Sequence, residues 1–158
     1  MQNTIVHPLK MQELNLPPYK FKLKQQGNRA QIFDAIRKKF VTLTPEEWVR
    51  QNFLQFLIQE KKFPASLIAV EAGLKYNQLQ MRTDVLVYDK SGKPYLMVEC
   101  KAPGIKITQD VFDQIARYNM VFKVKYLVVT NGISHFCCLM DYSKKSYAYL
   151  EEIPIFES

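Results

Sequence analysis

A carboxylate and an ammonium group end an otherwise apolar segment of this chain. Residues 95–98 (YLMV) form an unbroken apolar run, and Glu99 and Lys101 then stand on either side of Cys100. Because successive side chains of a strand point to opposite faces, Glu99 and Lys101 are expected on the same face. The pattern therefore predicts either a salt bridge or a functional site at the end of a buried strand.

A second carboxylate is expected next to Glu99. If residues 89–94 (DKSGKP) form the turn of a hairpin, the flanking segments pair with each other. Symmetric pairing sets Tyr88 opposite Tyr95, Val87 opposite Leu96, Val85 opposite Val98, and Asp84 opposite Glu99. Two facing carboxylates repel each other, and apolar surroundings raise the cost. Lys101 supplies one compensating charge, but two carboxylates are also what a hard divalent cation requires.

A structural alternative stays open at this point. The register follows from the turn length alone, so a bulge or a longer turn would move Asp84 away from Glu99. Arg82 is expected on the same face as Asp84 and could neutralise it in an ordinary ladder of surface charges. Both strands are otherwise apolar on both faces, which is typical of a covered central sheet and favours a functional role for the charges.

The first part of the chain is predicted to form an arm, a strand and two helices. Residues 1–18 contain prolines among polar residues and predict an extended arm, and residues 19–24 alternate apolar residues with lysines, as an edge strand with a basic face would. Gly27 and Asn28 are then expected to turn the chain into a short helix. Its apolar positions at helical spacing are Ile32, Phe33, Ile36 and Phe40. A second helix is predicted over residues 45–61, with Thr44 as its N-cap and Glu47 completing a capping box.

The second part is predicted to be rich in strands. Strands are expected at residues 67–70, 82–88, 95–101, 126–130 and 133–140, the last two joined by a hairpin turn at Asn131-Gly132. Residues 108–121 have helical periodicity. The acidic residues near the end, Glu151, Glu152 and Glu157, predict a solvated tail, and the role of Glu71 at the end of the first strand stays open.

Composition narrows the classes of function. A chain of 158 residues with 47% hydrophobic residues is expected to fold around one core. Its net charge of +7 favours an anionic partner such as nucleic acid or a membrane surface. Because no apolar run is long enough to span a bilayer and residues 1–10 do not resemble a signal peptide, we expect a cytoplasmic protein with no membrane role.

Several of these segments together resemble a known family. The run RTDVLVYDKSGKPYLMVECKAPG, followed by FDQIARYN and VTNG and preceded by LTPEEWVRQ, resembles the N-terminal nuclease domain of the type I restriction enzyme R subunit (HsdR), within the PD-(D/E)xK nuclease superfamily. The resemblance spans roughly residues 29–140. It implies a three-layer restriction-endonuclease-like α/β fold with a central mixed sheet, and a Mg²⁺- or Mn²⁺-dependent endodeoxyribonuclease activity.

The resemblance also implies roles for individual residues. Asp84 and Glu99 match the metal-binding acids of the family. Lys101 matches the lysine that orients or activates the attacking water and stabilises charge on the phosphate. Glu47 most nearly matches the acidic residue of the first helix, which completes the metal environment, although its capping position is a sufficient structural role.

Two residues of the second predicted helix match the RecB-like branch of the superfamily. Gln114 and Tyr118 match its glutamine and tyrosine, which support the site. The alternatives are an exposed helix residue for Gln114 and an ordinary core residue for Tyr118. Basic residues that could contact DNA phosphates are Lys61, Lys62 and Arg82, together with Arg37, Lys38, Lys39 and the row Lys20, Lys22 and Lys24.

The resemblance implies partners as well as a domain plan. The intact R subunit contains a helicase motor, whereas these residues contain no G-x-x-x-x-G-K-[ST] loop and hence no ATP site, so a partner chain of a restriction-modification system is expected to supply the motor or target recognition. The expected plan is an arm and edge strand over residues 1–28, the nuclease domain over 29–150 and the tail over 151–158. The alternatives are a non-catalytic DNA-binding or interaction module with the same fold, and a basic α/β protein with a structural charge ladder.

Overall fold

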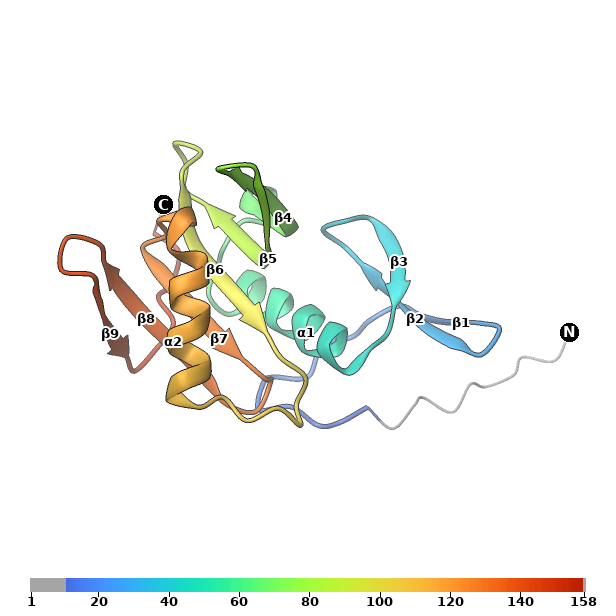
Figure 1. Cartoon of the computed structure of the whole chain (residues 1–158). Coiled ribbons are helices and arrows are strands. Elements are labelled where there is room, and N and C mark those ends of the chain that lie inside the picture. Colours follow the sequence, from blue (N-terminus) through green and yellow to red (C-terminus); the bar gives the residue numbers. More distant parts are fainter. Residues whose placement is uncertain (1–10, 158) are drawn as a thin grey trace, which may run out of the picture.

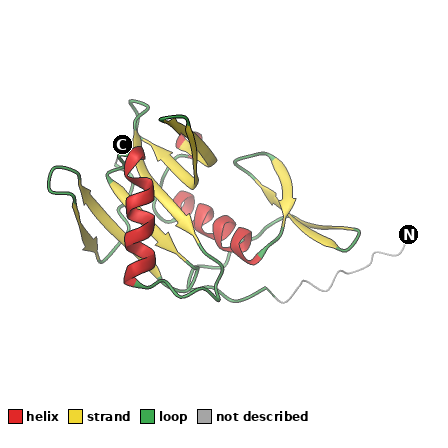
Figure 2. Ribbon diagram, viewed as in Figure 1, coloured by secondary structure: helices red, strands yellow, loops and turns green. Residues whose placement is uncertain are grey.

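The computed structural model describes residues 11–157, so the first ten residues of the expected arm lie outside the described residues. A six-stranded mixed sheet forms the centre of the molecule, with one long helix on each face, and a separate three-stranded sheet lies to one side (Figures 1 and 2). The strands of the central sheet are β4 (Ile68–Tyr76), β5 (Leu79–Tyr88), β6 (Pro94–Cys100), β7 (Tyr126–Thr130), β8 (His135–Asp141) and β9 (Ser146–Leu150). The helices are α1 (Pro45–Gln59) and α2 (Gln109–Tyr118), with 3₁₀ turns η1 (Ala65–Leu67) and η2 (Asn119–Phe122). The expected three-layer α/β fold is confirmed.

The central sheet has the order β4-β5-β6-β7-β8-β9, in which only β6 and β7 are parallel. A parallel pair needs a long crossover connection, and α2 lies within it. Strand β9 was not predicted. None of the helices within residues 11–157 is long and apolar enough to span a membrane.

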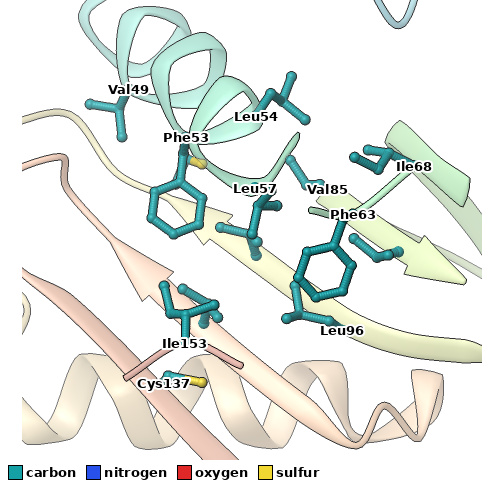
Figure 3. Packing of buried hydrophobic residues seen from close by; sticks show 14 residues of the cluster. Val49, Phe53, Leu54, Leu57, Phe63, Ile68, Val85, Leu96, Cys137 and Ile153 are labelled. Atoms are coloured by element: carbon teal, nitrogen blue, oxygen red, sulfur yellow. The ribbon is translucent and has the colours of Figure 1, made fainter. Parts of the chain in front are cut away.

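The two faces of the sheet are covered by different helices. Phe53 and Leu57 of α1 pack with Val85 and Val98 on one face (Figure 3). On the other face, apolar residues of α2 pack with a second set of strand residues: Phe112, Ile115 and Ala116 with Leu86, Met97 and Leu127. Because apolar side chains occupy both faces, β5 and β6 are covered central strands, as their unbroken apolar runs predicted.

The N-cap of α1 was predicted correctly, whereas the Glu47 side chain, expected to complete a capping box, binds Arg37 and Arg50. The Thr44 side chain accepts a hydrogen bond from the Glu47 backbone N–H at 3.0 Å, and Pro45 opens the helix, which ends at Gln59 rather than Lys61. Helix α2 starts in the same way, since the Thr108 side chain accepts from the Val111 N–H at 3.2 Å.

The short helix expected after Gly27 is wrong. This region forms β2 (Arg29–Asp34) and β3 (Lys39–Thr42), which pair with β1 (Leu23–Gln26) in the order β1-β2-β3. Gly27, at a φ of +59°, and Asn28 form a two-residue hairpin turn between the paired residues Gln26 and Arg29. The edge strand predicted at residues 19–24 therefore begins and ends later than expected. Of the apolar residues taken for a helical stripe, Ile32 and Phe33 lie in β2, Phe40 lies in β3 and Ile36 lies in the turn between them.

The acidic end of the chain is not a free tail. Glu151, Glu152 and Glu157 are exposed, but Ile153 is buried in the core on the α1 side. The Phe156 ring lies 5.6 Å from that of Phe63, and its backbone N–H donates to the carbonyl of Lys61 at 2.8 Å. Apolar residues between the glutamates thus hold this segment against the body of the protein.

Candidate active site

Asp84 and Glu99 meet where the backbone pairing of β5 with β6 stops. The predicted pairs Val87–Leu96 and Val85–Val98 are correct, whereas Tyr88 pairs with Pro94 rather than Tyr95 because the register shifts after Val87. Beyond the Val85–Val98 pair, side-chain hydrogen bonds connect β5 with β6. The Asp84 Oδ2 accepts from the Cys100 backbone N–H at 2.7 Å, and the Glu99 Oε1 accepts from the Thr83 hydroxyl at 2.9 Å.

A break in the alternation of β5 aims these side chains. Met81 and Leu86 are five residues apart, yet both pack in the core on the α2 side, so the alternation of faces slips once between them. On the neighbouring strand, Glu71 lies between the pairs that surround Asp84 and has a φ of +53°, which is uncommon for a residue other than glycine. Because of this irregularity Thr83 faces Glu99, and the next residue, Asp84, reaches α1.

The proximity of the two carboxylates perturbs Glu99. Burial and the Asp84 carboxylate together raise the pKa of Glu99 to about 8, although the Thr83 hydrogen bond and Lys101 act in the opposite direction. The Lys101 backbone N–H donates to the Thr130 carbonyl at 2.8 Å, which fixes this residue at the end of the parallel β6–β7 pair. With a pKa of about 8, Glu99 is protonated at neutral pH when no cation is bound.

Arg50 of α1, to which the sequence reasoning assigned no role, neutralises Asp84. Its Nη2 lies 2.8 Å from Asp84 Oδ1, and its Nη1 lies 2.9 Å from Glu47 Oε2. These carboxylates raise the pKa of the buried Arg50 guanidinium even though burial acts to lower it. A sequence signal existed, because Arg50 follows Glu46 and Glu47 at the helical spacings of four and three residues.

Glu47 is held by two arginines. Its Oε1 accepts from Arg37 Nη2 at 2.6 Å, and its Oε2 from Arg50 Nη1 at 2.9 Å. The neighbouring Glu46 is more exposed and interacts electrostatically with the site. Burial and the Asp84 carboxylate raise its pKa, while Arg50 and Lys101 act to lower it. Glu46 is therefore the better candidate for the acid that the first helix contributes.

Arg37 connects the small sheet to this network. Its guanidinium contacts Asp34 Oδ2 at 2.6 Å, Glu47 Oε1 at 2.6 Å and Glu71 Oε2 at 3.1 Å. Asp34 is fully buried, and its pKa is lowered because hydrogen bonds from Arg37 and Gln51 outweigh the effect of burial. The prediction that Arg37 contacts DNA is therefore not supported, and Glu71 takes part in the network through Arg37.

Gln114 and Tyr118 lie on the solvent side of α2. Gln114 is exposed, and half of Tyr118 is exposed, so Tyr118 is not the core residue that the structural alternative described. Within residues 11–157 no hydrogen bond or ring contact joins either side chain to Asp84 or Glu99. Helix α2 nevertheless covers the face of the sheet to which Glu99 points. Glu99 shares this face with Met97, which lies two residues earlier on β6 and packs with residues of α2.

Comparison with known proteins assigns the family. The family model for the N terminus of the type I restriction enzyme R protein (HSDR_N) matches residues 45–154, which is more than half of the chain. The chain belongs to this family. A solved fragment assigned as an HsdR subunit of a type I restriction enzyme from Vibrio vulnificus YJ016 has the same fold, with a TM-score of 0.50 and 20% sequence identity over 71% of this chain. The match covers 24% of that fragment, so this HSDR_N chain spans about a quarter of its length. No curated protein matches the sequence.

The carboxylates of this HSDR_N chain fit a hard cation better than a soft one. In the part of the chain that the structure describes, no three His, Cys, Asp or Glu side chains form a group arranged for a metal ion. Asp84 and Glu99 supply carboxylate oxygens, which suit Mg²⁺, an ion that keeps several waters and commonly uses only one or two carboxylates. The raised pKa of Glu99 is chemically consistent with such an ion, because a bound cation would relieve the repulsion by Asp84 that contributes to it.

The basic residues predicted to contact phosphates differ in their distance from the site. Lys61 and Lys62 follow the C-terminal end of α1, whereas Glu46 and Arg50, which act on Asp84, lie toward its N-terminal end. The Lys62 ammonium donates to the Gln59 carbonyl at 2.7 Å. Arg82 is exposed on β5. Of these three basic residues it is the nearest in sequence to the site, two residues from Asp84.

Proposed function

We propose that this HSDR_N domain is a metal-dependent endonuclease domain of the PD-(D/E)xK type that hydrolyses phosphodiester bonds of DNA. The observation that carries the proposal is the proximity of Asp84 to Glu99, whose pKa is raised to about 8 by burial and by Asp84, with Lys101 directly after the end of β6. A purely structural pair would gain from full compensation of its charge, whereas a cation site gains from an excess of carboxylate.

Each residue has a defined part in the proposal. Asp84 and Glu99 hold Mg²⁺ or Mn²⁺, which when bound stabilises charge on the non-bridging and leaving oxygens. Lys101 orients the attacking water and stabilises the phosphate, and Arg82 contacts a neighbouring phosphate. Glu46 replaces Glu47 as the helix residue that extends the site, because the Glu47 carboxylate is already bound to two arginines. Gln114 and Tyr118 support the site from α2 in the proposal.

Plasmid cleavage tests this function. Supercoiled plasmid is incubated with the protein in Mg²⁺ or Mn²⁺, and nicked and linear products are quantified for the wild type, Glu99→Gln and Lys101→Ala. Lys93→Ala is the matched control, because Lys93 is an exposed lysine in the turn at the other end of β6. We expect cleavage by the wild type and the control and none by the two site variants, with circular dichroism showing that all four are folded.

A specific observation favours a second candidate, a non-catalytic DNA-binding or interaction module. Arg50 already lies 2.8 Å from Asp84, and an arginine that permanently neutralises this acid would leave Glu99 without a metal partner. In that case the wild type leaves plasmid intact, and calorimetry detects no binding of Mg²⁺ or Mn²⁺. Binding of the ion without cleavage would instead support a nuclease domain that needs another component.

We further propose that such a component is a partner chain or domain that supplies nucleotide-driven movement and target recognition. The motif G-x-x-x-x-G-K-[ST] does not occur in the 158 residues, and the match covers 24% of the HsdR fragment. Mixing this chain with candidate restriction-system subunits and repeating the cleavage assay with and without ATP tests this part. The proposed setting is the cytoplasm, without a membrane partner.

A further inference from the structure

The net charge of the chain is concentrated in one small part of the fold. Residues 19–42 contain seven lysines and arginines and one aspartate, a net charge of +6, whereas the whole chain carries +7. These residues include the three strands of the small sheet, which precede the range 45–154 matched by the family model. Six of the seven basic residues are exposed, the exception being Arg37, which is bound to carboxylates: Lys20, Lys22, Lys24, Arg29, Lys38 and Lys39.

The two faces of the small sheet differ in character. One face is turned toward α1: Ile32 and Asp34 are fully buried, and Gln51 of α1 donates to Asp34 Oδ2 at 2.9 Å. The other face contains Phe33 and Phe40, which pair across β2 and β3 with their ring centroids 5.2 Å apart. This second face, with Lys22 and Lys24 of the adjacent chain segment, is the outward face of the small sheet.

The phenylalanine rings of the outward face hold ammonium groups in place. Lys24 Nζ lies 4.2 Å from the centroid of the Phe40 ring, and Lys22 Nζ lies 5.6 Å from that of Phe33. The Phe33 backbone N–H donates to the Lys22 carbonyl at 2.9 Å, so the pairing of β1 with β2 continues to Lys22. Two lysines two residues apart on a strand are separated by about 6.7 Å, a spacing comparable to that of successive phosphates on a nucleic-acid strand.

We infer that the outward face of the small sheet binds the sugar–phosphate backbone of duplex DNA, independently of base sequence. The inference rests on the proposed nuclease function only for the choice of DNA as the partner. Because ammonium groups cover the two phenylalanine rings, these rings are not free to stack on unpaired bases, which favours backbone contacts over a single-strand platform. The sheet lies beyond the N-terminal end of α1 (Figure 1), and Arg37, in the turn between β2 and β3, binds Glu47 in the first turn of that helix.

Binding is measured by fluorescence anisotropy with labelled DNA duplexes of two unrelated sequences, in EDTA so that cleavage plays no part. The wild type is compared with Lys22→Gln/Lys24→Gln and with the matched control Lys93→Gln/Lys144→Gln, which removes two exposed lysines from turns of the central sheet. We expect equal binding of both sequences, and for the small-sheet variant a loss of at least about tenfold in affinity at 0.1 M salt. The slope of log affinity against log salt should fall by about 1.8, since each phosphate contact contributes about 0.9.

The possible results separate this inference from the nuclease proposal. Absence of wild-type binding at 0.05 M salt, equal binding by all three proteins, or an equal loss in both variants would overturn the inference. Failure of plasmid cleavage alone would not, because binding is measured without metal. If both proposals hold, Lys22→Gln/Lys24→Gln raises the protein concentration needed for half-maximal cleavage, whereas Lys101→Ala abolishes cleavage while the small sheet still binds DNA.

Discussion

Replacing Glu99 with glutamine should make the protein more stable at alkaline pH. The folded protein holds the Glu99 proton until about pH 8, whereas the unfolded chain releases it near 4.5. Between these values the folded state binds more protons than the unfolded state, so the stability of the wild type falls as the pH rises and levels off above 8. The difference in pKa corresponds to a loss of up to about 5 kcal/mol, which glutamine does not undergo. Near pH 5 the variant and the wild type should be almost equally stable.

Urea unfolding at several pH values between 5 and 9 measures this effect, with fluorescence of Trp48, the single tryptophan, as the signal. The free energy of unfolding of Glu99→Gln minus that of the wild type should grow with pH in EDTA. It should shrink again in Mg²⁺, because an ion present at 100 times its dissociation constant stabilises the wild type by about 2.7 kcal/mol. Glu152→Gln, at an exposed position, is the control. A difference that stays constant from pH 5 to 9 would refute the claim that Asp84 and burial perturb Glu99.

Three further substitutions test the elements around the site. Arg50→Met leaves Asp84 without its buried partner and should destabilise the protein by about 3–5 kcal/mol in urea unfolding; a loss below 1 kcal/mol would contradict the network. Gly132→Ala places a Cβ 2.7 Å from a leucine side chain at a φ of +84°, and should lower the melting temperature, whereas Gly104→Ala, with no atom near its Cβ, should not. Thr44→Ala removes the N-cap of α1 and should cost about 1 kcal/mol in urea unfolding; no change would show that the cap contributes little.

The sequence was sufficient to predict those elements whose capping and turn signals lie within a few neighbouring residues. The cap at Thr44 and the hairpins around residues 89–93 and 131–134 have turn and capping residues that act over three or four positions, and their elements were predicted within a few residues. The segment from Gly27 to Thr42 was misread because apolar residues spaced three and four apart also fit two short strands joined by a turn. The structure has the two strands, and β2 pairs with β1 across the two-residue turn at Gly27-Asn28.

The arrangement of charges at the site was less accessible to sequence reasoning. The proximity of Asp84 to Glu99 followed from hairpin symmetry, which is a local argument. The contact of Arg50 with Asp84 joins residues 34 positions apart and depends on how α1 lies over the sheet. The positive φ of Glu71 could not be predicted either, since glutamate has no preference for that conformation.

The break in the alternation of β5 lets two neighbouring residues of this strand face different helices near the site. With strict alternation, Thr83 and Val85 would share a face, and Asp84 would point to the other side. The slip opposite Glu71 instead lets Thr83 bond Glu99 on the α2 side while Asp84 reaches Arg50 on α1. Asp84 thus receives its counter-charge from α1, whereas Glu99 accepts from the Thr83 hydroxyl and has Lys101 nearby. Burial and the nearby Asp84 carboxylate therefore raise the pKa of Glu99, and any bound cation would act chiefly on Glu99.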